Sequence, residues 1–296
     1  MSRARETALG TISVVASGLC FGSMPVFARA AYASGVDPPT LLLLRFTVAA
    51  AVLWAVLLAR GARLPRGRWL AVLAAMGGLG YAGQSFFYFT ALTMASAGVV
   101  TLVLYLYPAL VALLSRLVLG HALSPLQVAA VATALVGSVL TVGRAGDATP
   151  LGILLAALAA TTYAVYILTG SRIPAEVTPT ASSTAIITGA AISYAALGAV
   201  RGVRLPGTPG GWGAALAIAL VCTVLAIFLF QAGLQRLGAV RASVYSTVEP
   251  AFTLLLAAAL LGERLTALRV AGGALIIGAV VLLARSDLAR EGAPAG

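Results

Sequence analysis

Apolar residues fill long stretches of the chain, and short groups of glycine, proline, aspartate and arginine separate these stretches. Each stretch is close to the roughly 20 residues that a helix needs to cross a bilayer. Strands of a membrane barrel would instead be segments of roughly 10 residues that alternate apolar and polar positions. We therefore predict an all-α integral membrane protein with ten transmembrane helices, near residues 8–30, 39–59, 69–91, 97–119, 124–143, 151–170, 180–200, 212–234, 240–261 and 267–285.

The composition excludes a water-soluble protein. Of the 296 residues, 61% are hydrophobic and 9% are charged, whereas about 25% of the residues in an average soluble protein are charged. Ten spans leave only short loops, so no separate soluble domain fits. The apolar stretch after Arg3 and Arg5 is longer than the core of a signal peptide and ends without a convincing cleavage site. We expect that stretch to be the first span.

The net charge of +11 raises the question of nucleic-acid binding. All 19 basic residues are arginine, and they lie singly or in small groups between apolar stretches. This scatter predicts no nucleic-acid partner. If the N-terminus is inside, alternate loops place twelve arginines inside and six outside, with Arg45 within a span. Because short cytoplasmic loops retain positive residues, both termini are predicted to lie in the cytoplasm.

An internal repeat appears when the sequence is shifted by 142 residues. The shift aligns YPALVALLSRLVLGHALS, which begins at Tyr107, with EPAFTLLLAAALLGERLT, which begins at Glu249, so that prolines and glycines coincide. Two five-helix halves are therefore expected, residues 1–147 and 148–296. An odd number of spans makes the second half enter the membrane from the opposite side. Such inverted repeats are typical of secondary transporters, which bind substrate between the halves near the bilayer midplane.

Three segments also resemble a known family. EPAFTLLLAAALLGERLT resembles the C-terminal signature of the EamA family in the drug/metabolite transporter superfamily, LLLLRFTVAA resembles its second helix, and FYFTALTMASAGVVTLVLYLYP resembles its third-to-fourth helix passage. The resemblance covers essentially the whole chain and is closest to bacterial amino-acid exporters, including aromatic-amino-acid exporters of the YddG type. It implies outward transport across the bacterial inner membrane. The chain departs from the family at Phe21, where members often carry tryptophan, and at His121, where they often carry glutamate.

Two charged residues lie inside predicted spans. Glu249 is about ten residues into the ninth span, which places it roughly 15 Å deep, near the midplane. It is interpreted either as a functional carboxylate that binds a substrate ammonium or carries a proton, or as a group that caps backbone freed by Pro250. Arg45 is close enough to the outer surface for its side chain to snorkel, and we expect it to be a structural anchor. The alternative is that it attracts a carboxylate, which the sequence does not show.

Polar and aromatic residues recur at helical spacing in several spans. Residues three or four apart share one helix face, and a polar face avoids lipid. These faces predict an aromatic, amide-lined cavity that suits a zwitterion with an apolar side chain, although hydrogen bonding between helices would also explain them. The candidate cavity residues are Tyr81, Gln84, Tyr88, Thr101, Tyr105, Tyr163, Tyr166, Gln231, Tyr245 and Glu249.

Small residues and prolines suggest where helices pack or swing. Gly18 and Gly22 form a GxxxG spacing, and Gly77, Gly80 and Gly83 crowd the third span. Close packing between helices is the simpler interpretation, and a sliding surface is the alternative. The candidate hinges are Pro25, Pro108 and Pro250, where helix ends could swing.

The inventory of reactive residues does not favour an enzyme. The chain has one histidine, no lysine for a nucleotide-binding loop, and no cluster of aspartates for a metal ion. We therefore expect no cofactor and no metal site. The predicted function is export of amino acids, aromatic or broadly neutral, by a monomer in the lipid bilayer. Two alternatives stay open: a transporter of another metabolite or drug with the same fold, and a membrane scaffold that transports nothing.

Overall fold

The regular elements of the described residues are all helices. They come from a computed structural model that describes residues 3–91, 94–95, 100, 103–120, 123–142, 149–261 and 266–292. The first half contains α1 (Arg3–Gly22), α2 (Met24–Tyr32), α3 (Pro38–Ala59), α4 (Arg68–Ala75), the π-helix η1 (Met76–Tyr81), α5 (Ala82–Ala91), α7 (Tyr107–Leu119) and α8 (Pro125–Val142). The second half contains α9 (Pro150–Gly170), α10 (Pro179–Arg201), α11 (Pro209–Ala219), the π-helix η2 (Leu220–Leu225), α12 (Ala226–Leu237), α13 (Ala239–Ser246), α14 (Val248–Leu261) and α15 (Ala267–Gly292).

These helices account for the predicted spans. Six segments are long and apolar enough to cross a membrane, judged by length and composition: Arg5–Ala33, Pro38–Ala59, Arg68–Ala91, Pro150–Gly170, Pro179–Arg201 and Pro209–Leu237. Three shorter apolar helices, Tyr107–Leu119, Pro125–Leu140 and Val270–Leu282, occupy the fourth, fifth and tenth predicted spans. The ninth consists of α13 and α14, which are separated at Thr247. The prediction of a ten-helix membrane protein is confirmed.

Four helices begin with a capping side chain followed by proline. Each capping oxygen accepts a hydrogen bond of 3.1–3.3 Å from the backbone N–H three residues later. The caps are Asp37 for α3, Thr149 for α9, Thr178 for α10 and Thr208 for α11. A cap satisfies one of the unpaired N–H groups at a helix start, and proline loses no helical bond in the first turn. These pairs fix where the helices start.

The two halves run through the bundle in opposite directions. Residues 60–67 follow the C-terminal end of α3, whereas the equivalent loop of the second half, 202–208, lies against the opposite end of α3. There the backbone N–H of Arg204 donates to Oγ1 of Thr40 at 3.1 Å. The backbone N–H of Gly207 donates to the carbonyl oxygen of Ser34 at 3.0 Å. Equivalent loops thus lie at opposite ends, as the odd number of spans predicts.

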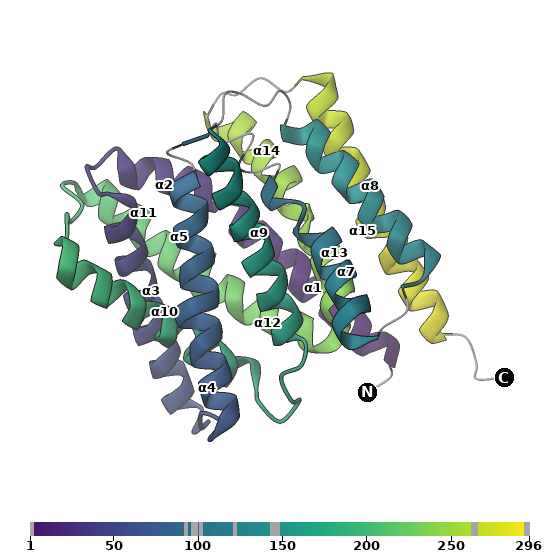
Figure 1. Ribbon diagram of the computed structural model, residues 1–296, viewed down its shortest axis with the longest axis horizontal. Coiled ribbons are helices and arrows are strands. Elements are labelled where there is room, and N and C mark those ends of the chain that lie inside the picture. Colours follow the sequence, from purple (N-terminus) through teal and green to yellow (C-terminus); the bar gives the residue numbers. More distant parts are fainter. Residues whose placement is uncertain are drawn as a thin grey trace.

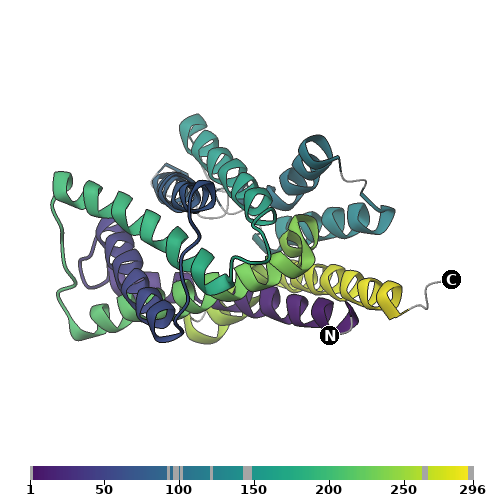
Figure 2. The same ribbon diagram turned by 90° about the horizontal axis from the view of Figure 1, so that it is seen from below.

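Each half packs against its counterpart in a repeated pattern. α8 packs against α15, and α3 packs against α10. Figures 1 and 2 show α8 and α15 side by side at one edge of the bundle. α1, the first helix of the first half, packs against α12, which ends the third span of the second half. In the same way α9, the first helix of the second half, packs against α5, which ends the third span of the first half. One core is therefore shared between the halves.

Some glycines permit unusually close helix contacts. A Cβ at Gly22 would lie 3.0 Å from the backbone oxygen of Glu249, so α1 packs directly on the backbone of the ninth span. A Cβ at Gly77 would overlap the backbone oxygen of Ile186 in α10. Gly83, by contrast, has open space where a Cβ would be. The packing interpretation therefore applies to Gly22 and Gly77, and it does not explain Gly83.

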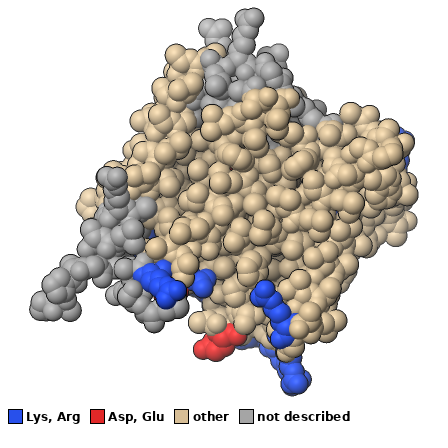
Figure 3. Space-filling model, turned by 180° about the vertical axis from the view of Figure 1, so that it is seen from behind, with Lys and Arg blue, Asp and Glu red and all other residues tan. Residues whose placement is uncertain are grey.

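The outer surface is broadly apolar. Figure 3 shows one face on which arginine and acidic side chains gather near the edges, mostly the lower edge, while the middle of the face carries neither. Large apolar side chains are exposed, among them Leu79 at 76%, Leu117 at 71% and Val200 at 85%. A surface of this kind suits contact with lipid, with charges kept at the edges of the membrane.

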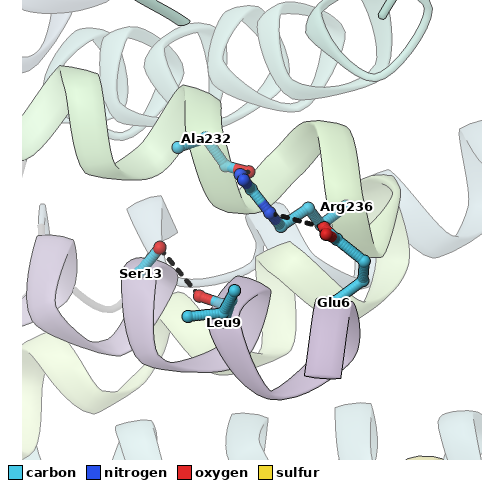
Figure 4. Close-up of polar contacts among 5 residues, drawn as sticks. All are labelled: Glu6, Leu9, Ser13, Ala232 and Arg236. Carbon is cyan, nitrogen blue, oxygen red and sulfur yellow. Dashed lines mark hydrogen bonds and ion pairs between the residues drawn. The ribbon is translucent and has the colours of Figure 1, made fainter. Parts of the chain in front are cut away.

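An ion pair joins the first helix to the end of the eighth span. Nε of Arg236 on α12 lies 2.9 Å from a carboxylate oxygen of Glu6 on α1, and Nη1 of Arg236 donates to the carbonyl oxygen of Ala232 (Figure 4). Nearby on α1, Ser13 Oγ donates to the carbonyl oxygen of Leu9 at 2.7 Å. In Figure 1, α1 begins and α15 ends at the same end of the bundle. This placement is consistent with termini on one side of the membrane.

Candidate functional site

Arg45 lies in α3 with its side chain inside the bundle, where it is 2% exposed. Its Nε donates to Oγ1 of Thr223 at 2.7 Å, and its Nη2 donates to the phenol oxygen of Tyr81 and, at 3.5 Å, to the backbone oxygen of Cys222. The guanidinium also lies over the rings of Phe46 and Tyr81, 4.9 and 5.4 Å from their centroids. The expectation that Arg45 snorkels to the outer surface is wrong, because its partners are all buried in the interior.

Both π-helices supply partners to Arg45. Tyr81 is the last residue of η1, while Cys222 and Thr223 lie inside η2. Thr223 also donates its hydroxyl hydrogen to the carbonyl oxygen of Ile218 at 2.9 Å, so its oxygen can accept from Arg45. A π-helical turn inserts one extra residue and is frequent at functional sites. η1 lies in the third span of the first half and η2 in the third span of the second half. Equivalent segments of the two halves therefore supply the partners of Arg45.

Aromatic rings extend from Arg45 across the interior as a connected series. Neighbouring ring centroids lie 4.8–6.3 Å apart, within the range of favourable aromatic pairs. In order, the rings are Tyr194, Phe46, Tyr81, Tyr166, Tyr163, Tyr107 and Tyr105. We call these seven residues the ring series. Its members come from both halves, so it crosses the interface between them.

Glu249 is the second residue of α14, just after the break at Thr247. A carboxylate in the first turn of a helix is stabilised by the positive end of the helix dipole. The residue is partly exposed, and its backbone oxygen would lie 3.0 Å from a Cβ at Gly22 of α1. Glu249 therefore lies where the start of α14 packs against α1.

The other predicted cavity residues fall into two groups. Gln84 and Tyr88 on α5 and Tyr163 on α9 are partly exposed. The buried group consists of Tyr81, Tyr105, Tyr166, Gln231 and Tyr245. Thr101 lies outside the described residues, as does His121. The predicted set is thus divided between partly accessible side chains and side chains inside the packed core.

Gln231 illustrates the buried group. It lies on α12 with none of its surface exposed, and its Nε2 donates to the phenol oxygen of Tyr166 at 2.9 Å. Its Oε1 is buried without a hydrogen-bond partner. The amide nitrogen of Gln231 thus makes a hydrogen bond between two helices, α12 and α9, which was the alternative to a role in a cavity.

The candidate hinge prolines lie in the first turns of helices and not at kinks within them. Pro25 and Pro108 are the second residues of α2 and α7, and Pro250 is the third residue of α14. The regular helix is interrupted by a turn just before each of them, at Ser23, at residues 105–106 and at Thr247. Leu106 and Thr247 keep right-handed helical dihedral angles, and their backbone N–H groups donate to the residue three positions earlier. The latter two breaks are separated by 247 − 105 = 142 residues, which is the offset of the repeat.

Several interior residues were not predicted from the sequence. Phe46 and Tyr194 sit in apolar stretches without a distinctive spacing, and only the folded packing brings them to Arg45 and Tyr81. Tyr107 had a usable signal, because the 142-residue shift aligns it with Glu249. Its hydroxyl donates to the backbone oxygen of Ser243 at 3.3 Å.

Two inverted five-helix halves around an interior arginine, a carboxylate and a series of aromatic rings define a membrane protein of the transporter class. The model of the EamA-like transporter family matches residues 8–143 and again residues 150–285. The chain belongs to the EamA-like transporter family. The two matches also confirm that the halves are repeats of one unit.

Similar proteins cover nearly the whole chain. One is the aromatic amino acid exporter YddG of Ancylobacter novellus, 33% identical over 96% of this chain and 100% of that protein. Another is the uncharacterized transporter YcbK of Bacillus subtilis, 26% identical over 92% of this chain and 91% of that protein. A solved crystal structure superposes with a TM-score of 0.81 at 27% identity, covering 94% of this chain and 98% of that one.

Proposed function

We propose that this protein is a secondary transporter that exports amino acids, aromatic or broadly neutral, across the bacterial inner membrane. The observation that carries the proposal is the 33% identity to an aromatic amino acid exporter over the full length of that protein. Membership in the EamA-like transporter family supports transport in general. The ring series supports an apolar or aromatic substrate side chain, because rings offer contact area and their hydroxyls orient polar groups.

Transport proceeds by alternating access between the two inverted halves. The first half comprises residues 1–147 and the second residues 148–296, with the cytoplasmic termini of a monomer at one end of the bundle. The helix breaks at residues 105–106 and at Thr247 support this mechanism, because they lie at equivalent places in the fourth and ninth spans. Half-helices that meet at such breaks can tilt separately, with Pro108 and Pro250 in their first turns as hinges.

The cavity of the transporter is lined by the partly exposed side chains of Gln84, Tyr88, Tyr163 and Glu249. The buried residues Tyr105, Tyr107 and Tyr166 close the path beside them in this conformation. Their exposure changes when the halves rock to the opposite state. Thr101, Gln231 and Tyr245 complete the proposed lining of the substrate path.

Uptake of labelled phenylalanine and leucine into proteoliposomes tests this function. We expect saturable uptake that unlabelled neutral amino acids reduce, and background uptake in liposomes without protein. Saturable transport of another metabolite, with no competition by amino acids, would replace the proposed substrate. Folded protein that moves no solute of a broad panel would favour a membrane scaffold instead.

A further inference from the structure

Arg45 carries a buried charge that forms no ion pair with an acidic residue in the described part of the chain. Among the described residues, no carboxylate lies within the ion-pair distance of 4.0 Å from its guanidinium. Its partners are a threonine hydroxyl, a phenol, a backbone carbonyl and two rings, all of them neutral. A positive charge inside a membrane protein is costly, and such residues mark the path of a substrate or an ion.

The hydrogen bonds of Arg45 leave part of the guanidinium free. Its hydrogen bonds within the described chain use Nε and Nη2, and none uses Nη1. The two N–H donors of Nη1 therefore have no partner among the described residues, in a side chain that is 2% exposed in this conformation. Guanidinium groups bind carboxylates strongly, because charge-assisted hydrogen bonds are shorter and stronger than neutral ones.

Glu249 presents a carboxyl group from the other half of the protein. Its carboxylate makes no hydrogen bond with the described residues, and the residue is partly exposed. Glu249 lies near the Arg45 site, because its backbone oxygen would be 3.0 Å from a Cβ at Gly22, and Oγ of the next residue, Ser23, lies 3.4 Å from Sγ of Cys222. The carbonyl oxygen of Cys222 accepts from Arg45, and Glu249 itself forms no ion pair with Arg45. An arginine on α3 and a carboxyl group on α14 thus lie near one another without forming an ion pair. A ligand with one charge of each sign would satisfy both.

We propose that Arg45 and Glu249 bind the two charges of a zwitterionic substrate, an inference that rests on the proposed amino-acid transport. The α-carboxylate accepts hydrogen bonds from Nη1 of Arg45, and the α-ammonium donates to the carboxylate of Glu249. The substrate side chain then lies against the adjoining members of the ring series, among them Tyr163, which is partly exposed. Because α3 belongs to the first half and α14 to the second, the bound substrate also links the two halves.

This arrangement predicts discrimination by charge. Phenylalanine satisfies both residues, whereas 2-phenylethylamine leaves the arginine unpaired and 3-phenylpropionate leaves the glutamate unpaired. A buried charge without its partner weakens binding strongly, so each analogue should compete on the order of 30-fold less well than phenylalanine. The ring is identical in all three molecules, so the comparison isolates the charged groups.

Competition in proteoliposomes tests the assignment of each charge. We would measure how the three compounds inhibit exchange of labelled phenylalanine by the wild type, Arg45→Gln and Glu249→Gln. The Arg45→Gln variant should lose most of the preference for phenylalanine over phenylethylamine and keep its preference over phenylpropionate. Glu249→Gln should show the reverse pattern. For a variant that no longer exchanges, ligand-induced thermal stabilisation in detergent gives the same two ratios.

The matched controls are Arg116→Gln and Glu176→Gln, which change exposed residues outside the site and should leave both ratios unchanged. If Arg45→Gln does not fold, the wild-type ratios and Glu249→Gln still decide the matter. A wild type that accepts phenylethylamine as well as phenylalanine overturns the proposal, as do variants that keep both wild-type ratios. Failure of the wild type to move any amino acid overturns the proposed function as well.

Discussion

Arg45 and its buried partners show how single residues build this interior. Its guanidinium is held by Thr223 of η2 and by Tyr81 of η1, so one side chain of the first half joins both π-helices. The sequence indicated that a charge lies in the second span. It could not indicate the direction of the side chain, because the partners are 36 and 178 residues away along the chain.

Replacing Thr223 by valine should destabilise the protein. The substitution keeps the side-chain shape but removes the oxygen that accepts from Nε of Arg45 at 2.7 Å. A hydrogen bond to a charged group contributes about 1.5–3 kcal/mol, so the loss should appear as a lower unfolding temperature in detergent. The control is Thr47→Val, at an exposed position of α3. Equal stability of the two variants would show that the Thr223 hydroxyl does not hold Arg45.

At the scale of helices, the sequence predicted the spans but not the places where a span is interrupted. Hydropathy and capping pairs such as Thr149 with Pro150 locate most helix starts, because both signals are local. The π-helices η1 and η2 and the break at Thr247 have no comparable local signal, since tertiary contacts select them. The prolines indicated the region of the breaks, and the folded chain places each break just before its proline.

Gly77 gives a sharp test of helix packing. A Cβ there would overlap the backbone oxygen of Ile186, so Gly77→Ala should push η1 away from α10. We expect the free energy of unfolding to fall by about 1–3 kcal/mol. Gly83→Ala lies in open space on the adjoining helix α5 and should instead stabilise by up to about 1 kcal/mol. Thermal unfolding of the two variants measures the contrast. Similar values for both would contradict the close contact of η1 with α10.

Pro250 tests whether the break in the ninth span matters for movement. Pro250→Ala restores a backbone N–H in the first turn of α14 and lets helix continue across Thr247. We expect slower exchange with nearly unchanged affinity for phenylalanine, because the half-helices then tilt together. Pro125→Ala at the exposed start of α8 is the control. An unchanged exchange rate in Pro250→Ala would remove the hinge role.

The inverted relation of the halves is a property of the whole molecule. It followed from the odd number of spans and the 142-residue shift, and equivalent loops do lie at opposite ends of α3. The sequence could predict this because topology depends on the number of spans and not on side-chain detail. The arginine count also predicts the orientation, with both termini inside, and this stays a prediction.

Cysteine labelling in intact bacteria checks that orientation. In a background without Cys20 and Cys222, Arg204→Cys should react with a membrane-impermeant maleimide added outside. Arg63→Cys, in the equivalent loop of the first half, should react only after the cells are opened. Both positions are exposed, so protection reflects the side of the membrane. Labelling of both from outside would contradict the inverted arrangement, and the opposite result would reverse the orientation.

The central claim is that one interior site serves both sides of the membrane in turn, and counterflow tests it most directly. Proteoliposomes are loaded with a high concentration of unlabelled phenylalanine and diluted into a trace of labelled phenylalanine. A carrier with alternating access should accumulate label transiently above its outside concentration, since each return step brings labelled substrate inward. Label that only equilibrates, or that enters at the rate of protein-free liposomes, would contradict transport of amino acids by alternating access.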